Sequence, residues 1–211
     1  MSTAHARRIG RPDQQASEEL VRHIVATAAT LFVEQGYAAT SLEQIAAAAG
    51  SGKQTLYRRF GSKQDLFAAV IVEKSRELVA LAAEVEIAQP DPVAALKATC
   101  RLIFDFVLQP ESISLQRVMV GELSRFPELA EMVLEDCKRP FEDLLERLVE
   151  AAARSGRIKV DDVKRTHQLM ISLFTGWPSR EALFGKSAFA DAAERDAYFE
   201  AGWSLFLRGV G

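Results

Sequence analysis

Residues 40–62 contain two short segments with helical apolar spacing, joined by a glycine turn and preceded by a longer helical segment. In residues 17–35, apolar side chains recur at offsets of three and four, which is the pattern of one face of an amphipathic helix. Residues 42–49 and 53–60 keep this spacing over about two turns each, and Gly50-Ser51-Gly52 forces a tight turn between them. Two short helices that follow a supporting helix form a helix-turn-helix arrangement.

Polar residues stand where the starts of these helices are expected. Ser17 predicts the N-cap of the first helix. Thr40 or Ser41 predicts the N-cap of the second helix, with Glu43 or Gln44 closing a capping box. These caps support helical ends close to the limits of the apolar pattern.

The rest of the chain also has helical spacing and no persuasive strand alternation. We expect Pro140 and Pro178, which fall inside apparent helices, to kink or split them. The predicted fold class is therefore all-α, with a three-helix N-terminal domain and a larger helical domain. The further predicted helices lie at about residues 62–86, 92–108, 112–125, 127–154, 161–184 and 191–208.

Charge is divided unevenly between the two predicted domains. Residues 1–63 carry eight lysines and arginines and five acidic residues, net +3, whereas residues 64–211 carry eighteen and twenty-four, net −6. This sign favours contact between phosphate and the first part of the chain. We predict a flexible basic arm over 1–16, a DNA-binding domain over 17–62 and a ligand-binding and dimerisation domain over 63–211.

Several protein classes find no support in the sequence. A hydrophobic content of 48% and a charged content of 26% are globular values, and no apolar run approaches the ~20 residues that span a bilayer. The N-terminus lacks the apolar core of a signal peptide, so we expect a cytoplasmic protein. No catalytic, cofactor or metal-binding motif is present, so the expectation is no enzyme, no cofactor and no metal. Cys100 and Cys137 suit buried, inert thiols better than a redox pair.

The third segment can expose one face while it packs through another. Leu56 and Phe60 lie one turn apart as its inner anchors. The residues that remain free to point outward can read base edges or contact phosphate, unless they form only a solvated charged face. They are Lys53, Gln54, Thr55, Arg58 and Arg59.

The same region resembles the DNA-binding signature of the TetR family over about residues 17–68. The likeness rests on many residues that match the family signature in type and in spacing along the chain. They are Gly36 to Ala46 (GYAATSLEQIA), Ala49-Gly50, Thr55-Leu56-Tyr57, Phe60, Ser62-Lys63 and Leu66-Phe67. Ser51 and Gly52 depart from the pattern, because the family usually has an apolar residue and then a capping Ser or Thr at these positions.

The resemblance implies further DNA contacts. Tyr57 would donate its hydroxyl to a phosphate, although its ring can also pack, and Lys63 would meet another phosphate. Backbone N–H groups at Thr40 and Ser41 would offer further donors. Arg11, within Gly10-Arg11-Pro12, would either enter the adjacent minor groove or give only nonspecific attraction.

The C-terminal part is similar to the sensing domain of an AefR-like branch of this family, over residues 122–129 and 152–158. The family analogy implies a homodimer, because two recognition helices must reach two half-sites of the operator. The last two long helices would form its interface, although some of their apolar residues belong to the core of one subunit. The interface candidates are Leu169, Leu173, Phe174, Trp177, Phe199, Trp203 and Phe206.

A small-molecule effector, apolar in character, would bind among the helices of the second domain. The candidate lining residues are Phe104, Arg117, Met119, His167 and Met170. The expected function is that of a repressor released by this effector from a near-palindromic double-stranded DNA operator. The alternatives are an architectural DNA-binding protein without sequence preference or ligand, and an interaction module that no longer binds DNA.

Overall fold

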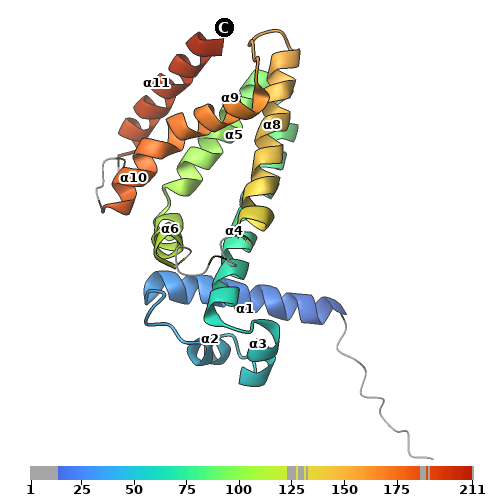
Figure 1. Ribbon diagram of the computed structural model, residues 1–211, viewed down its shortest axis with the longest axis vertical. Helices are drawn as coiled ribbons and strands as arrows, with labels where there is room; N and C mark the ends of the chain where they lie inside the picture. Colours follow the sequence, from blue (N-terminus) through green and yellow to red (C-terminus); the bar gives the residue numbers. More distant parts are fainter. Residues whose placement is uncertain are drawn as a thin grey trace, which may run out of the picture. The chain divides into compact units, whose positions relative to one another are not determined.

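The computed structural model describes residues 14–122, 127, 131, 133–185, 189 and 191–210. The chain divides into two compact units, one up to Val70 and one from Ile71 onward. All regular secondary structure in the described residues is helical, which confirms the predicted all-α class (Figure 1). The predicted arm lies mostly in residues 1–13, and these are outside the described residues.

The first unit contains α1 (Gln14–Glu34), α2 (Leu42–Ala48), α3 (Lys53–Arg59) and the first turns of α4 (Lys63–Ala88). The predicted N-cap at Ser17 is wrong, because α1 already begins at Gln14 and Ser17 lies inside it. Gln14, Gln15 and Ala16 are polar or small residues that tolerate helix, so the apolar pattern does not mark where the helix begins.

Small and aromatic side chains pack this unit. Ala46 and Ala49 of the α2 segment are buried, and such small residues let helices approach closely. Phe32, Tyr37 and Phe67 form a triangle of rings with centroids 5.2–5.7 Å apart. Edge-on and tilted ring pairs of this kind add to the stability of a core beyond their buried area.

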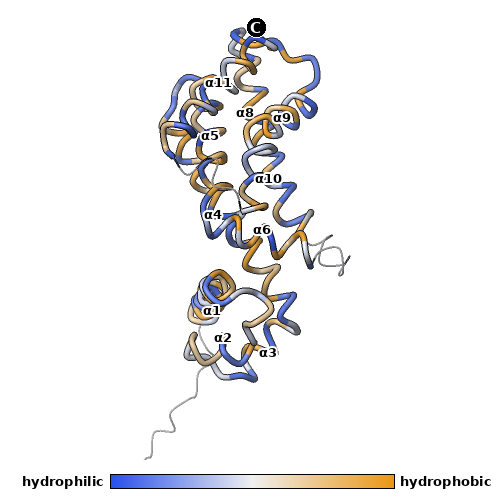
Figure 2. The backbone as a smooth tube through the Cα atoms, turned by 90° about the vertical axis from the view of Figure 1, so that its left-hand side faces the viewer, coloured by the Kyte–Doolittle hydropathy of each residue, from blue (hydrophilic) through white to orange (hydrophobic). Residues whose placement is uncertain are grey.

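The second unit holds the rest of α4 and the remaining helices, in which hydrophobic and hydrophilic residues alternate (Figure 2). Lys159 in the loop after α8 donates its backbone N–H to the carbonyl of Val210, so this loop contacts the end of the last helix. The elements are α5 (Pro92–Val107), α6 (Pro110–Glu122), η1 (Leu134–Lys138), α8 (Arg139–Arg154), α9 (Val163–Ile171), η2 (Ser172–Gly176), α10 (Trp177–Leu183) and α11 (Ala192–Val210).

Both internal prolines follow a π-helical turn. Pro140 is in the first turn of α8, directly after η1, and Pro178 is in the first turn of α10, directly after η2. A proline lacks the N–H that would bond to the preceding turn, and its ring clashes with the carbonyl four residues back. The wider π turn accommodates this clash without ending the helical path.

The core of the second unit is rich in aromatic rings. Phe174 stacks on Phe199 with centroids 4.9 Å apart, and Phe104 stacks on Tyr198 at 6.0 Å. Gly202 allows α11 to approach η2, because a Cβ there would lie 3.0 Å from a ring carbon of Phe174. The last helix is therefore packed directly on the core of its own unit.

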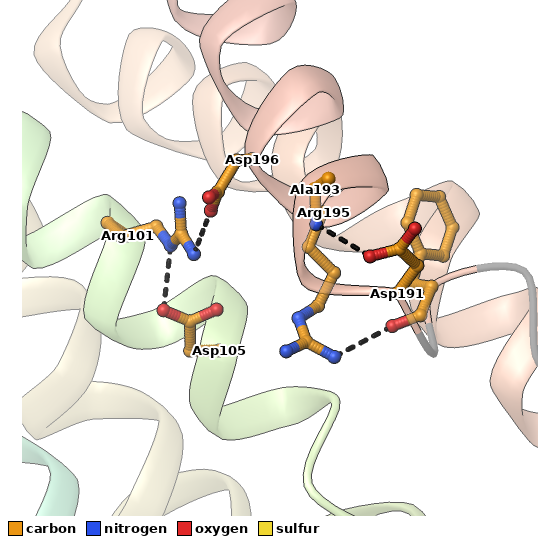
Figure 3. Close-up of polar contacts among 7 residues, drawn as sticks. Arg101, Asp105, Asp191, Ala193, Arg195 and Asp196 are labelled. Atoms are coloured by element: carbon orange, nitrogen blue, oxygen red, sulfur yellow. Dashed lines mark hydrogen bonds and ion pairs between the residues drawn. The ribbon is translucent and has the colours of Figure 1, made fainter.

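A polar bridge joins α5 to α11 at the edge of this core (Figure 3). The Arg101 guanidinium lies 2.7 Å from Asp105 on its own helix and 2.6 Å from Asp196 on α11. Arg101 also lies over the Phe199 ring, 5.4 Å from its centroid. Near it, Arg195 donates to the carbonyl of Phe189 (Figure 3). The contacts of Arg101 fix the N-terminal end of α11 against α5.

Within the described residues, no helix is both long and apolar enough to cross a membrane. The same residues contain no group of three or more His, Cys, Asp and Glu side chains suited to hold a metal ion.

Candidate functional site

The start of α2 is set by a capping box. The Ser41 hydroxyl accepts from the Gln44 N–H at 3.2 Å, and the Gln44 side chain accepts from the Ser41 N–H at 2.7 Å. The backbone N–H of Ser41 is therefore engaged within the protein. Thr40 is 1% exposed, and its hydroxyl lies 2.8 Å from the carbonyl of Gly36 and 3.2 Å from that of Leu31. Its side chain is a structural element that ties α2 to the end of α1.

The turn into α3 uses the two positions that depart from the family pattern. Gly50 has a φ of 60°, a conformation that favours glycine. Gly52 is the N-cap of α3 in an extended conformation and makes no side-chain cap. The Ser51 hydroxyl is buried and finds no hydrogen-bond partner among the described residues. A serine at this position therefore buries a polar atom in a place that suits an apolar side chain.

The recognition helix α3 packs through one side and exposes the other. Leu56 and, at its end, Phe60 are buried in the first unit. Most of the predicted contact residues are exposed and Thr55 is half-buried; they are Lys53, Gln54, Thr55, Tyr57, Arg58 and Arg59. This is the arrangement that a helix needs in order to lie in a DNA groove.

A carboxylate of α2 binds two of these side chains. Glu43 Oε1 lies 2.8 Å from Lys53 Nζ and accepts the Tyr57 hydroxyl at 2.9 Å. Lys53 also lies over the Tyr57 ring, 5.6 Å from its centroid. The hydrogen bond from Lys53, with help from backbone N–H groups and Tyr57, lowers the pKa of Glu43 to about 2. The same carboxylate raises the pKa of Lys53 and of Tyr57.

The arginines of α3 differ in their contacts. Arg59 donates to the hydroxyl of Ser17 on α1, which holds the guanidinium beside the supporting helix. Arg58 and Gln54 make no hydrogen bond or ion pair with any residue that the structure describes. These two side chains are therefore the freest polar groups on the exposed face of α3.

Lys63 holds the loop between α1 and α2. Its ammonium lies 2.8 Å from the carbonyl of Tyr37, 3.0 Å from that of Thr40 and 3.4 Å from that of Ala38. It also lies over the Tyr37 ring, 4.4 Å from the centroid. An ammonium can donate three hydrogen bonds, and these three carbonyls accept them. In this conformation Lys63 stabilises the fold of the first unit.

Arg11, the remaining predicted contact, lies outside the described residues.

The second unit contains an apolar cavity of about 370 Å³. Its walls come from α4, α5, α6 and the segment around η1 and α8. The apolar lining residues are Ile71, Leu78, Ile103, Phe106, Val107, Leu115, Met119, Val133 and Phe141, and the others are Lys74, Ser75, Ser112, Gln116, Cys137 and Lys138.

Of the five predicted effector-binding residues, the structure brings Met119 alone to this cavity. Phe104 and Met170 are buried in the core. Arg117 donates to the carbonyls of Ala182 and Leu183 at 2.8 and 3.1 Å, so it caps the end of α10. His167 is buried beside a smaller, more polar hollow between α8 and α9, with Nδ1 3.6 Å from Glu146.

The predicted interface residues fall into two groups. Phe174, Phe199, Trp203 and Phe206 are buried in the core of their own unit. Leu169 and Trp177 are exposed, at 65% and 52%, and Leu173 is half-buried. Phe184 and Leu205, which are not among the predicted interface residues, are also exposed large apolar residues.

Three cavity residues that the sequence did not predict share a helix face with the predicted Met119. On α6, Ser112, Leu115, Gln116 and Met119 are spaced three, four and seven residues from the first, so they share a face. The other walls depend on which helices become neighbours in the fold, and no local pattern specifies that.

Comparison with known proteins agrees with both parts of this description. Residues 24–70 match the family described as bacterial regulatory proteins, tetR family. Residues 94–209 match the AefR-like transcriptional repressor, C-terminal domain. The crystal structure of a candidate TetR-family transcriptional regulator from Mesorhizobium loti MAFF303099 covers 92% of this chain and 98% of its own, with a TM-score of 0.83 and 24% identity. That likeness is one of fold.

Of two curated relatives, one is a transcriptional activator and the other is a transcriptional repressor. The transcriptional activator FasR of Mycolicibacterium smegmatis is 28% identical over 127 residues, which are 59% of this chain and 58% of FasR. The chain thus aligns with less than two thirds of the length of FasR. The transcriptional repressor NicS of Pseudomonas putida is 26% identical over 199 residues, 92% of this chain and 91% of NicS. The chain belongs to the TetR family of bacterial transcriptional regulators, with a C-terminal domain of the AefR-like kind.

Proposed function

We propose that this regulator is a homodimeric repressor that binds a near-palindromic DNA operator and is released from it by a small, mainly apolar effector. The observation that carries the proposal is the exposed polar face of α3, whose opposite side is buried in the first unit through Leu56 and Phe60. A helix so anchored offers donors to base edges and phosphates at fixed positions.

The proposed DNA contacts differ in role. Gln54 and Arg58 suit base readout, because their polar groups are unengaged within the described residues. Lys53, Thr55, Tyr57 and Arg59 suit phosphate or base contact after small side-chain movements. Arg11, Thr40, Ser41 and Lys63 complete the proposed interface. Thr40 and Ser41 would act by fixing the start of α2, because their own backbone N–H groups are engaged by Tyr37 and Gln44, and Lys63 would act by holding the loop before α2.

The effector is proposed to bind in the cavity beside α6. A volume of about 370 Å³ falls within the range of small-molecule sites, and most of the lining is apolar. Binding there would favour one arrangement of the dimer over another, and the affinity for the operator would fall by the coupling free energy.

The second copy of the chain is proposed to cover the exposed apolar residues of α9 to α11. Leu169, Trp177, Phe184 and Leu205 are large apolar side chains that water reaches in the single chain.

We also place the protein in the cytoplasm, where an operator is accessible, and assign it no catalytic activity, cofactor or metal.

The test is fluorescence anisotropy with DNA from upstream of the protein's own gene and with scrambled DNA, across a salt series. Specific binding should exceed nonspecific binding by ~10³ or more. Arg58→Ala should lower the affinity and flatten the salt slope by about one unit. Arg154→Ala, which removes the same charge from α8, is the control and should leave both unchanged. Equal affinity for both DNAs would favour an architectural role, and no binding to either would refute the proposal.

A further inference from the structure

One wall of the effector cavity carries two polar groups next to each other. Ser112 and Gln116 are one turn apart on α6, and both line the cavity together with Leu115 and Met119. Within the described residues, no hydrogen bond engages the Ser112 hydroxyl. The pair is therefore a polar spot in an otherwise apolar wall.

The orientation of the Gln116 amide follows from its neighbour. Its Nε2 donates to the carbonyl of Val107 at 3.0 Å. A carbonyl can only accept, so the amide oxygen must point away from Val107. No donor among the described residues reaches that oxygen. The spot thus offers an acceptor at Gln116 and a hydroxyl, which donates and accepts, at Ser112.

The charges around the cavity are already compensated. Lys74 lies 3.1 Å from Glu77 and 3.2 Å from Glu111, and Lys138 lies 3.5 Å from Glu142. Two lysines therefore meet three carboxylates. The remaining titratable group in the lining is the Cys137 thiol, and burial raises its pKa to about 11, so it stays neutral. A carboxylate in this cavity would have to compete with three acidic side chains for Lys74 and Lys138, and it would lie against a mainly apolar lining, which disfavours a charged group.

We propose that the effector is a neutral, mainly apolar molecule with one hydroxyl group, which donates to Gln116 Oε1 and accepts from Ser112. An ionised acid of the same size would bind much more weakly. The inference rests on the proposed function, since it assigns a ligand class to the proposed effector cavity.

The experiment compares three probes of one ring system on the full-length protein: 2-naphthol, 2-naphthoate and naphthalene. Calorimetric titration near neutral pH without DNA should give the order naphthol, naphthalene, naphthoate. Naphthoate should bind at least about tenfold more weakly than naphthol, because it must be protonated to enter. Its affinity should rise about tenfold for each unit by which the pH is lowered, while that of naphthol stays constant.

Gln116→Leu should weaken 2-naphthol about three- to tenfold and leave naphthalene unchanged. Gln109→Leu is the matched control, because Gln109 lies outside this cavity and lines another hollow, so it should change neither probe. Naphthoate binding as tightly as naphthol, an equal loss of naphthol in both variants, or no binding of any probe would each overturn the ligand class.

The anisotropy assay separates this inference from the proposed function. If naphthoate binds tightly and releases operator DNA, the ligand class is wrong and the effector mechanism stands. If operator DNA is not recognised at all, the proposed function fails, whereas the order of the three probes still tests the cavity.

Discussion

Glu43 on α2 accepts a hydrogen bond from the Tyr57 hydroxyl on α3, with 2.9 Å between the two oxygens. The same carboxylate oxygen, Oε1, pairs with Lys53. A phenol has one proton to donate. If Tyr57 is to donate to a DNA phosphate, it must leave Glu43, so the carboxylate and the phosphate compete for one donor. Lys53 keeps two further N–H groups but shares its charge with the same carboxylate. Glu43 therefore acts against the phosphate contacts that the neighbouring residues are proposed to make.

The first prediction concerns Glu43→Gln, which keeps the shape of the side chain and removes its charge. The affinity for operator and for scrambled DNA should rise about two- to fivefold, the size expected from an exposed ion pair. The salt slope should steepen by up to about one unit, because Lys53 becomes free to displace a counterion. Since the pKa of Glu43 is about 2, its carboxylate stays ionised and the gain should be the same at about pH 6 and pH 8.

Glu34→Gln is the control for this change. Glu34 is exposed on α1 and makes no hydrogen bond or ion pair with the described residues, so its substitution removes one negative charge without freeing a donor. An equal gain in both variants would mean that net charge alone governs the affinity. A loss of affinity in Glu43→Gln would show instead that the carboxylate positions Lys53 and Tyr57 for DNA.

The second prediction concerns Lys63, whose ammonium donates hydrogen bonds to the carbonyls of Tyr37, Ala38 and Thr40. Lys63→Met should lower the free energy of unfolding by about 1–3 kcal/mol, because part-buried carbonyls lose a charged donor. Thermal denaturation followed by circular dichroism measures this loss. Lys53→Met, on exposed α3, should leave the melting temperature nearly unchanged and flatten the salt slope for DNA.

The reverse pattern would contradict this assignment. If Lys63→Met kept its melting temperature and flattened the salt slope by about one unit, Lys63 would be a phosphate contact, as the family resemblance implies.

The sequence was sufficient to predict the elements whose ends carry local signals. α2 begins at Leu42 after the Ser41 cap, and α3 is delimited by the glycine turn and by Phe60. Both depend on residues within one or two turns of each other. The start of α1 was misplaced because polar residues before Ser17 continue the helix without adding to its apolar face.

Side-chain partners across the fold could not be predicted in the same way. Lys63 reaches carbonyls some 25 positions earlier in the chain, and Arg117 reaches the end of α10, 65 and 66 positions later. Phe104 is a predicted lining residue that lies in the core, because an apolar residue on a helix can occupy either a core or a cavity wall. Only the packing of neighbouring helices separates the two.

The third prediction concerns Ser51, whose buried hydroxyl has no hydrogen-bond partner among the described residues. Ser51→Ala removes this hydroxyl and leaves the backbone bond from Ser51 N–H to the Ala46 carbonyl in place. The free energy of unfolding should rise by about 1 kcal/mol, since burying an unpaired polar group is unfavourable. Chemical denaturation measures the change. A less stable Ser51→Ala would mean that the hydroxyl is hydrogen-bonded in solution.

The fourth prediction concerns the exposed apolar residues of α9 and α10. Leu169 is 65% exposed, and Trp177 is 52% exposed with Arg180 lying 4.4 Å from its ring centroid. If a second copy covers this surface, a symmetric interface would bring each substituted side chain into it twice. Leu169→Glu should therefore convert the dimer to a monomer, and light scattering coupled to size-exclusion chromatography measures the mass.

Val120→Glu is the matched control, because Val120 is 70% exposed on α6 and lies outside the proposed interface. It should leave the mass and the operator affinity unchanged. Leu169→Glu should lower operator affinity strongly while the helical content is kept, since one recognition helix alone reaches one half-site. A Leu169→Glu protein that stays dimeric would place the second copy on another face of the unit. A Leu169→Glu monomer with full operator affinity would instead separate DNA binding from dimerisation, and the operator would then need only one half-site.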